Sequence, residues 1–212
     1  MKYETVRGHG LTQHTQKKSR FIGEAYPVST EEEARALLEE TKKRYWDASH
    51  TCFAFRVGLG GKAVSRFSDA GEPSGTAGKP ILDVIEGWDL TNVLVLVTRY
   101  FGGTLLGTGG LTRAYSEAAR IAVEAAGTVL MEEQQYLTIA MDYTDLGKMQ
   151  YQIGQKGLAA ESVVYADKVT MGIWVPLDQV SSFEKMVVDL SFGRLKAEEG
   201  QVLFKEVRKG GK

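Results

Sequence analysis

Apolar and polar residues follow two different rhythms along the chain. Up to Met131, apolar runs alternate with glycine-rich segments, whereas from Gln135 onward glycine is sparse. In the first part, the alternation and the turn residues predict strands at 20–28, 52–57, 62–67, 93–97 and 128–131. Helices are predicted after a cap at Ser29 or Thr30, at 80–85 and at 108–126.

Two of these segments carry the strongest pattern. Residues 93–97 read Val-Leu-Val-Leu-Val, a continuous aliphatic run typical of a central strand that is covered on both faces. In 108–126, apolar residues recur on one side of a helix and charged residues on the other. Segments 52–57 and 62–67 flank the glycine-rich turn at 58–61, which predicts a hairpin.

The second part shows a regular succession of elements. The pattern predicts strand 136–141, helix 144–156, strands 159–166 and 170–176, helix 178–190 and strand 197–207. This βαββαβ order is that of ferredoxin-like domains. The polar stretch Glu132-Glu133-Gln134 is taken as the boundary, so the chain is expected to form an α+β protein with domains at 1–132 and 133–212.

The net charge and the cysteine content limit the range of functions that the chain could have. The formal net charge is -1, and neither half is basic, since residues 133–212 hold ten Lys and Arg against eleven Asp and Glu. Nucleic-acid binding would therefore need a local patch. Cys52 is the single cysteine, which excludes an internal disulfide and argues against a cysteine-based zinc site. The polar start and the lack of a long apolar run predict a cytoplasmic protein that does not enter a membrane.

Function is expected in the glycine-rich segment from Ser68 to Tyr115. Gly107-Thr108-Gly109-Gly110 opens a helix, where unpaired N–H groups and the helix dipole favour an anion. Arg99 and Arg113 could join these amides in holding a phosphate. The alternative is structural, with glycines that only allow close packing and Arg99 paired to Asp69 or Glu72.

Residues in and near this segment bear on three further functions. The chain contains the residue types that a hydrolase needs, namely Asp47, His50, Cys52, Asp69, Glu72 and Ser74. However, the sequence has no Gly-x-Ser-x-Gly elbow, and both Cys52 and His50 also fit structural roles. A kinase of the GHMP type would need a serine-rich loop, which is replaced here by Leu-Gly-Thr-Gly-Gly-Leu. A binding module could use Tyr100, Phe101 and Tyr115 beside the two arginines.

The chain resembles the YigZ/IMPACT family in four blocks: Lys18–Phe21, Asp47–Cys52, Ser68–Pro80 and Val97–Tyr115. The resemblance implies an N-terminal α/β domain of the ribosomal-protein/GHMP-kinase type and a C-terminal domain like the last domain of elongation factor G. It also implies a role tied to translational control through protein contacts in the eukaryotic branch, and to nucleic acid or the ribosome in the bacterial branch. Ala70 stands where many relatives carry a second Asp, which argues against a metal site in this loop.

The sequence thus predicts a non-catalytic binding protein that associates with RNA, the ribosome or a translation factor and uses no cofactor. Backbone amides and the two arginines would take phosphates, and two carboxylates would orient the arginines or accept from sugar hydroxyls. The alternative is a small hydrolase or nucleotide-binding enzyme using the same pocket. The predicted surface consists of Asp69, Glu72, Ser74, Thr76, Arg99, Tyr100, Gly102, Gly103, Thr108, Gly110 and Arg113.

Overall fold

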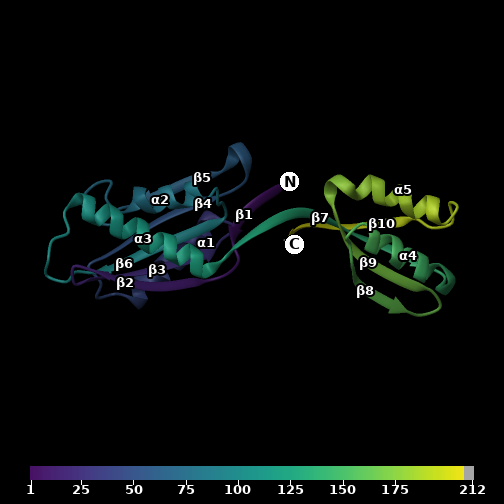
Figure 1. Ribbon diagram of the computed structural model, residues 1–212, viewed down its shortest axis with the longest axis horizontal. Helices are drawn as coiled ribbons and strands as arrows, with labels where there is room; N and C mark the ends of the chain where they lie inside the picture. Colours follow the sequence, from purple (N-terminus) through teal and green to yellow (C-terminus); the bar gives the residue numbers. More distant parts are fainter. Residues whose placement is uncertain (208–212) are drawn as a thin grey trace. The chain divides into compact units, whose positions relative to one another are not determined.

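The computed structural model describes residues 1–207 and contains two compact units, each built on its own sheet (Figure 1). The N-terminal unit comprises Tyr3–Leu130, and the C-terminal unit comprises the chain from Met131 together with Met1–Lys2. The protein is therefore α+β, as the sequence predicted, and both of its sheets are antiparallel. Within the described range, no helix is long and apolar enough to span a membrane.

The N-terminal sheet has β6 (Val93–Tyr100) at its centre. Its strand order is β2-β3-β6-β4-β5, with β2 at Gly10–Gln16, β3 at Ser19–Pro27, β4 at His50–Val57 and β5 at Val64–Ser68. Every residue of β6 up to Arg99 is buried, because both faces of the sheet are covered there. The central strand and the β4–β5 hairpin are thus confirmed. The short strand β1 (Lys2–Val6) belongs to the other sheet, where it pairs with β7 (Thr128–Met141).

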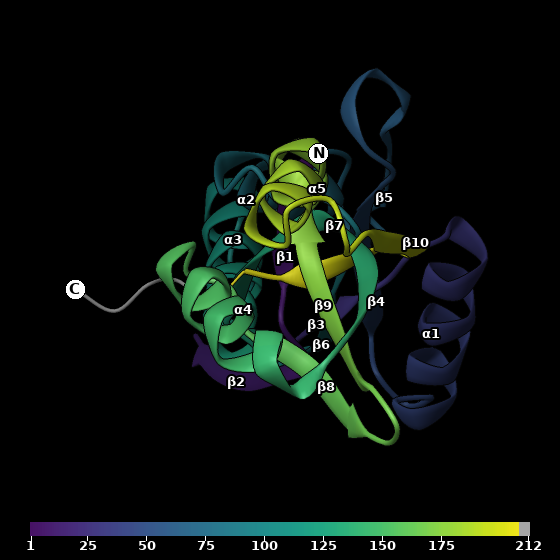
Figure 2. The same cartoon turned by 90° about the vertical axis from the view of Figure 1, so that its right-hand side faces the viewer.

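Helices cover the N-terminal sheet on both sides. Helix α1 (Glu31–Arg44) lies on one face, and α2 (Gly78–Gly87) and α3 (Thr108–Ala126) lie on the other, as Figure 2 shows. Thr30 caps α1, since its hydroxyl accepts a hydrogen bond from the Glu33 amide while the Glu33 carboxylate accepts one from the Ser29 amide. Each predicted helix of this part is present.

Strand β7 (Thr128–Met141) corrects one prediction. The sequence suggested two strands separated by a polar boundary at 132–134, but the strand is continuous. Its polar side chains have partners, since Glu132 pairs with Lys2 at 2.7 Å and Gln135 donates to Glu199 at 2.8 Å. Polar residues that are satisfied by neighbouring strands do not end a strand. The division between the two units falls inside β7, after Leu130.

The C-terminal unit has the predicted order of elements. After β7 come α4 (Tyr143–Gln155), β8 (Ala160–Tyr165), β9 (Val169–Pro176), α5 (Val180–Leu190) and β10 (Ala197–Glu206). A short 3₁₀ helix at Leu177–Gln179 precedes α5, and another lies in the N-terminal unit at Gly60–Lys62. The spatial order of strands is β8-β9-β7-β10. One core joins both helices to the sheet, with members such as Met149, Ile153, Phe183, Val187, Ile139 and Met171.

Helix α3 packs unusually close to strand β3, where glycine is required. A Cβ atom on Gly23 would lie 2.4 Å from the backbone oxygen of Ala118 in α3. The nearest residues of the helix at this contact are Ala118 and Ala122, both with small side chains. The close approach therefore depends on glycine and alanine on the two facing elements.

We predict that Gly23→Ala lowers the free energy of unfolding by about 1–3 kcal/mol, because the added methyl group forces α3 away from the sheet. The control is Gly87→Ala at the end of α2, where nothing lies within 4 Å of the added atom. This control should be neutral or stabilising by about 0.4–1 kcal/mol. Urea denaturation of both variants is the measurement, and equal midpoints would contradict the packing argument.

Candidate functional site

The glycine-rich loops meet at one edge of the N-terminal sheet. Register places Arg20 of β3 opposite Tyr100 of β6, Arg99 opposite His50, and Ser68 at the end of β5 beside β4. The turn 17–18, the α1–β4 connection, the β5–α2 loop 69–77 and the β6–α3 loop 101–107 therefore share this edge, which we call the loop face. The sequence predicted a surface made by the glycine-rich loops between Ser68 and Tyr115; the turn 17–18 and the α1–β4 connection, which were not part of that prediction, lie at the same edge.

Gly102 joins two of these connections. A Cβ atom on Gly102 would lie 2.0 Å from the carbonyl of Lys18, so only glycine lets the β6–α3 loop lie against the 17–18 turn. Ser19 secures the contact, because its hydroxyl accepts a hydrogen bond from the Gly102 amide at 3.2 Å. The neighbouring Phe101 amide donates to the Ser49 hydroxyl at 3.1 Å, which ties the loop to the start of β4 as well.

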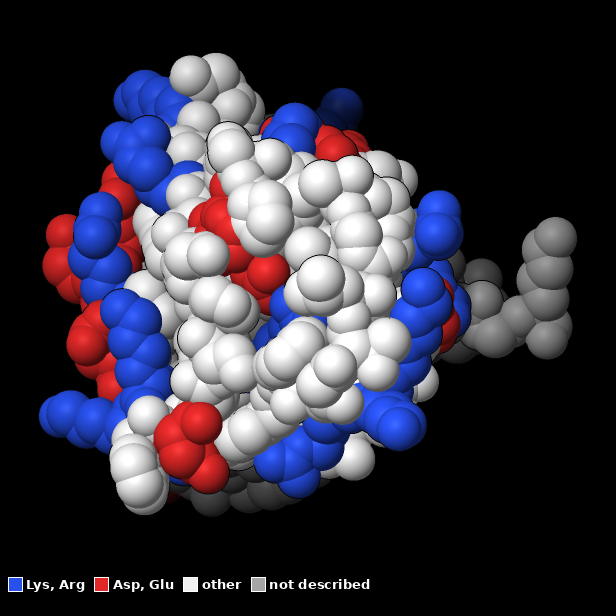
Figure 3. Space-filling view, turned by 90° about the vertical axis from the view of Figure 1, so that its left-hand side faces the viewer, with Lys and Arg blue, Asp and Glu red and all other residues white. Residues whose placement is uncertain are grey.

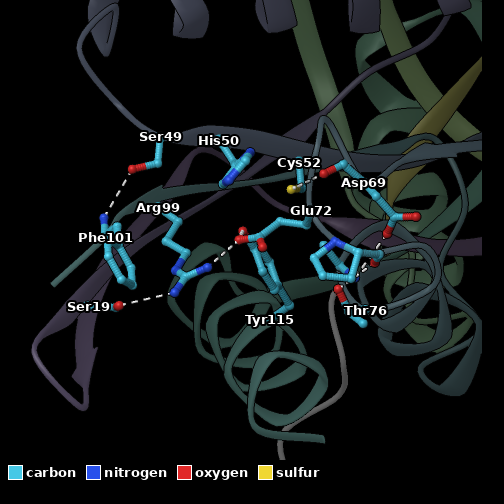
Figure 4. A network of polar contacts seen from close by, with 12 residues as sticks. Ser19, Ser49, His50, Cys52, Asp69, Glu72, Thr76, Arg99, Phe101 and Tyr115 are labelled. Carbon is cyan, nitrogen blue, oxygen red and sulfur yellow. Dashed lines mark hydrogen bonds and ion pairs between the residues drawn. The ribbon is translucent and has the colours of Figure 1, made fainter. Parts of the chain in front are cut away.

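A buried ion pair lies beneath the loop face (Figure 4). The Arg99 guanidinium donates to the Glu72 carboxylate at 2.7 Å, and the two side chains are only 6% and 3% exposed. The Tyr115 hydroxyl donates to the same carboxylate oxygen at 2.8 Å. Of the two interpretations of Arg99, pairing with Glu72 is therefore the one present. The guanidinium also lies 5.6 Å from the ring centre of Phe21 and 5.4 Å from that of Phe101.

Asp69 organises the loop that leads into α2. Its carboxylate accepts hydrogen bonds from the amides of Gly75, Ala77 and Gly78 at 2.8–3.0 Å. Burial opposes ionisation, but the three amide donors outweigh it and hold the pKa of Asp69 below its usual value. Thr76 supports the same loop, since its hydroxyl donates to the Pro73 carbonyl at 2.6 Å. Asp69 thus shapes the loop and is not the partner of Arg99.

Three residues that a hydrolase could use, Cys52, His50 and Asp47, each have a structural partner nearby. Cys52 is fully buried, its thiol donates to the Asp69 carbonyl at 3.0 Å, and burial raises its pKa to about 12. Such a thiol is a poor nucleophile at neutral pH. His50 Nδ1 lies 2.9 Å from the Ala70 carbonyl, and Asp47 accepts from Tyr100 at 2.7 Å. Across residues 1–207, no three or more His, Cys, Asp or Glu side chains are grouped to hold a metal ion.

The outer layer of the loop face carries exposed basic and aromatic side chains. The Arg20 guanidinium lies 4.2 Å from the ring centre of Tyr100, and the Phe101 ring is 49% exposed. Lys17 and Lys18 are exposed in the turn beside the β6–α3 loop. Figure 3 views this end of the N-terminal unit: Lys and Arg surround a largely uncharged area with a few acidic side chains in its middle. The predicted surface did not include Lys17, Lys18 or Arg20, although two adjacent lysines in a turn were a visible signal.

The start of α3 lies at the margin of this face. Gly107 has φ 74, and Thr108 is exposed, whereas Gly110 is buried against Leu106. Arg113 is exposed, and its guanidinium reaches back toward Gly109 at the helix start. It also lines a groove of about 710 Å³ with side chains of α2, and no contact described in the structure joins it to Arg99.

The predicted site residues therefore fall into two groups. Those that hold the loops in place, by buried side chains, hydrogen bonds or close packing, are Asp69, Glu72, Thr76, Arg99, Gly102 and Gly110. Those at the surface are Ser74, Tyr100, Gly103, Thr108 and Arg113, of which Tyr100 is half-buried. The loop face is thus a surface held rigidly from below.

We predict that Arg99→Ala costs about 3 kcal/mol in the free energy of unfolding, because the Glu72 carboxylate stays buried without its cationic partner. Adding Glu72→Gln to this variant should recover part of the loss, since the buried charge is removed. Thermal and urea denaturation of the single and double variants measure the coupling. Simple additivity of the two losses would show that the pair does not interact.

We predict that Asp69→Asn destabilises the protein at neutral pH, with a deficit that shrinks in acid. A carboxylate whose folded pKa is lowered stabilises the fold above its unfolded pKa of about 4. This stabilisation is lost as pH falls through the lowered folded value. Urea midpoints from pH 7 to pH 3 test this, with Asp167→Asn in the exposed β8–β9 turn as the control. A deficit independent of pH would contradict it.

The chain is similar to known bacterial proteins over most of its length. The chain is 33% identical over 204 residues to the IMPACT family member YvyE of Bacillus subtilis, which covers 96% of this chain and 94% of YvyE. It is also 33% identical over 180 residues to the IMPACT family member YigZ of Escherichia coli, covering 84% of this chain and 88% of YigZ.

Two solved structures are similar to different extents. A crystal structure described as that of a hypothetical protein matches with a TM-score of 0.61 and 30% identity, covering 94% of this chain and 98% of that chain. The structure described as the two-domain translational regulator Yih1 is 28% identical, covers 56% of this chain and 46% of that chain, and has a TM-score of 0.34. Yih1 is thus a distant homologue.

Two family models match in succession along the chain. The Impact N-terminal domain matches residues 17–123, which contain all four sequence blocks and the whole loop face. A domain of unknown function, DUF1949, matches residues 139–194 in the C-terminal unit. The chain therefore belongs to the IMPACT family, as a two-domain member of the type represented by bacterial YigZ and YvyE.

Proposed function

We propose that the protein acts by binding, and that its loop face associates with RNA, most directly the RNA of the ribosome or of the translation machinery. The observation that carries this proposal is the division of the loop face into two layers. A buried network of hydrogen bonds and one ion pair, made by Arg99, Glu72 and Tyr115, holds the loops in place. Above them, exposed basic and aromatic side chains remain available to a ligand.

Rigid support favours binding, because side chains that are already ordered lose little entropy when a ligand arrives. Lys18 and Arg113 would contact phosphates, and the exposed amides at Gly103 and Thr108 would add hydrogen bonds. The exposed ring of Phe101 offers a stacking surface for an unpaired base, whereas the Tyr100 ring is already covered by the Arg20 guanidinium at 4.2 Å. Ser74, exposed on the neighbouring loop, would donate a hydrogen bond from its hydroxyl.

Within this proposal, Asp69, Glu72 and Arg99 act indirectly. Arg99 is held by Glu72 and Ser19, so moving it to a phosphate would leave a buried carboxylate unpaired. We therefore assign these three side chains to shaping the surface rather than to contacting the ligand. Phosphate contacts fall instead to exposed cations.

Family membership supports a link to translation. The eukaryotic branch of the family is tied to translational control, and Yih1 is described as a translational regulator. The two folds fit the same setting: we assign the N-terminal unit to the ribosomal-protein/GHMP-kinase type and the C-terminal unit to the ferredoxin-like type seen in the last domain of elongation factor G. The β8-β9-β7-β10 order with both helices in one core supports the second assignment.

We predict that the protein co-sediments with ribosomes or ribosomal RNA at low salt and less so at high salt. Replacing Lys18 and Arg113 by glutamine should weaken binding and reduce the salt slope by roughly one unit per lost phosphate contact. The matched control replaces Lys62 and Arg66, which lie on the β4–β5 hairpin outside the loop face, by glutamine. No binding at low salt, or an equal loss in the control, would overturn the proposal.

A further inference from the structure

Phe192, between α5 and β10, is presented to solvent in a strained backbone conformation. Its side chain is 88% exposed, and its φ angle of 54° lies in the left-handed region. A bulky residue is a genuine outlier there. The ring gains almost nothing from burial, so the stability of the fold does not explain why phenylalanine occupies this position.

The hydrogen bonds around Phe192 show which position of the α5 C-terminus it occupies. The Phe192 amide donates to the Asp189 carbonyl at 3.2 Å, and the Gly193 amide donates to the Val188 carbonyl at 2.8 Å. These two bonds form a Schellman motif, in which Phe192 occupies the left-handed position that glycine usually takes at a helix C-terminus. The backbone would thus accept glycine more readily than the residue it has.

The loop that carries Phe192 is firmly held. The buried Ser191 hydroxyl donates to the Val187 carbonyl at 2.8 Å and accepts from the Leu195 amide at 2.9 Å. Arg194 forms a two-pronged ion pair with Asp145 of α4 at 3.0 and 3.1 Å. Because the backbone that carries the ring is already held, binding has to order only the side-chain torsions of Phe192, which lowers the entropy lost on association.

A groove between α4 and α5 begins beside this ring. Lys148 joins the two features, because its ammonium group donates to the Leu190 carbonyl at 3.2 Å and lies 5.6 Å from the ring centre of Phe192. The groove has a volume of about 440 Å³ and is lined by Lys148, Gln152, Ser182, Lys185, Met186, Asp189 and Leu190. Apolar side chains and an excess of positive charge are thus combined in one recess.

This combination favours a peptide over a nucleic acid. Met186 and Leu190 suit an aliphatic or aromatic side chain, and Met is typical of adaptable protein-binding surfaces. Lys148 and Lys185 outnumber the single carboxylate, Asp189, so the charge complements acidic residues. The C-terminal half as a whole is not basic, which gives no general attraction for a phosphate backbone.

We propose that Phe192 and the α4–α5 groove form a docking site for a partner protein, which contributes a segment of apolar and acidic residues. Phe192 would insert between apolar side chains of the segment, one apolar residue of the segment would enter the groove, and its carboxylates would pair with Lys148 and Lys185. This site lies in the C-terminal unit and does not depend on the function proposed for the loop face.

The test uses the full chain and the substitution Phe192→Gly, which removes the ring and relieves the backbone. A phage-displayed library of random peptides is panned on the wild type and on this variant in parallel. The proposal expects enriched peptides that combine Asp or Glu with apolar residues, and whose affinity falls about ten-fold or more in Phe192→Gly. Its melting temperature should equal or exceed that of the wild type, and Trp46→Ala, a change of another exposed aromatic residue, should bind normally.

Replacing Lys148 and Lys185 by glutamine should weaken the same peptides. Several results would overturn the proposal: no peptide that distinguishes the wild type from Phe192→Gly, enriched peptides without acidic residues, or a lower melting temperature for Phe192→Gly. Binding of labelled oligouridylate that is lost in Phe192→Gly would assign the site to nucleic acid instead. Self-association in sedimentation velocity that is lost in this variant would assign it to a second copy of the chain.

Discussion

The buried pair of Arg99 and Glu72 is the constraint on which the loop face depends. One partner comes from the end of the central strand, and the other from the loop before α2, so the pair joins segments that are 27 residues apart. Tyr115 of α3 completes the contact, and burial raises the pKa of its hydroxyl well above the usual value, so it remains a donor. A charge withdrawn from water is stable only while its partners stay in place. Strand, loop and helix are therefore fixed together.

This constraint separates support from recognition. Side chains beneath the surface, such as Glu72 and Asp69, hold the loops, and exposed side chains such as Lys18, Arg113 and Phe101 meet solvent. In the sequence, an arginine that supports the loops cannot be told from one that binds a ligand, because both would stand in a glycine-rich motif. Burial and pairing decide between the two roles.

Much of the fold could be predicted because local patterns agree with tertiary packing. The apolar residues on both faces of β6 predict a central strand, and the regular apolar side of α3 predicts a helix that packs on the sheet. Strand β7 was divided wrongly, because Glu132 and Gln135 are polar and their partners come from distant segments. No local pattern reveals such pairing.

The site was predicted less completely for the same reason. Glycine in the sequence indicates the loops, but the sequence does not decide between the two roles of Arg99, which only the 2.7 Å contact with Glu72 distinguishes. Nothing in the sequence points to Phe192, because one phenylalanine in a sequence shows neither its exposure nor its left-handed backbone.

Hydrogen–deuterium exchange of Glu72→Gln against the wild type tests the central claim most directly. If the buried pair fixes the loop face, the β5–α2 loop and the β6–α3 loop should both exchange faster in the variant, although only the first contains the substitution. Exchange in the C-terminal unit should stay unchanged. Faster exchange confined to the β5–α2 loop would contradict the account, because the two loops would then be ordered independently.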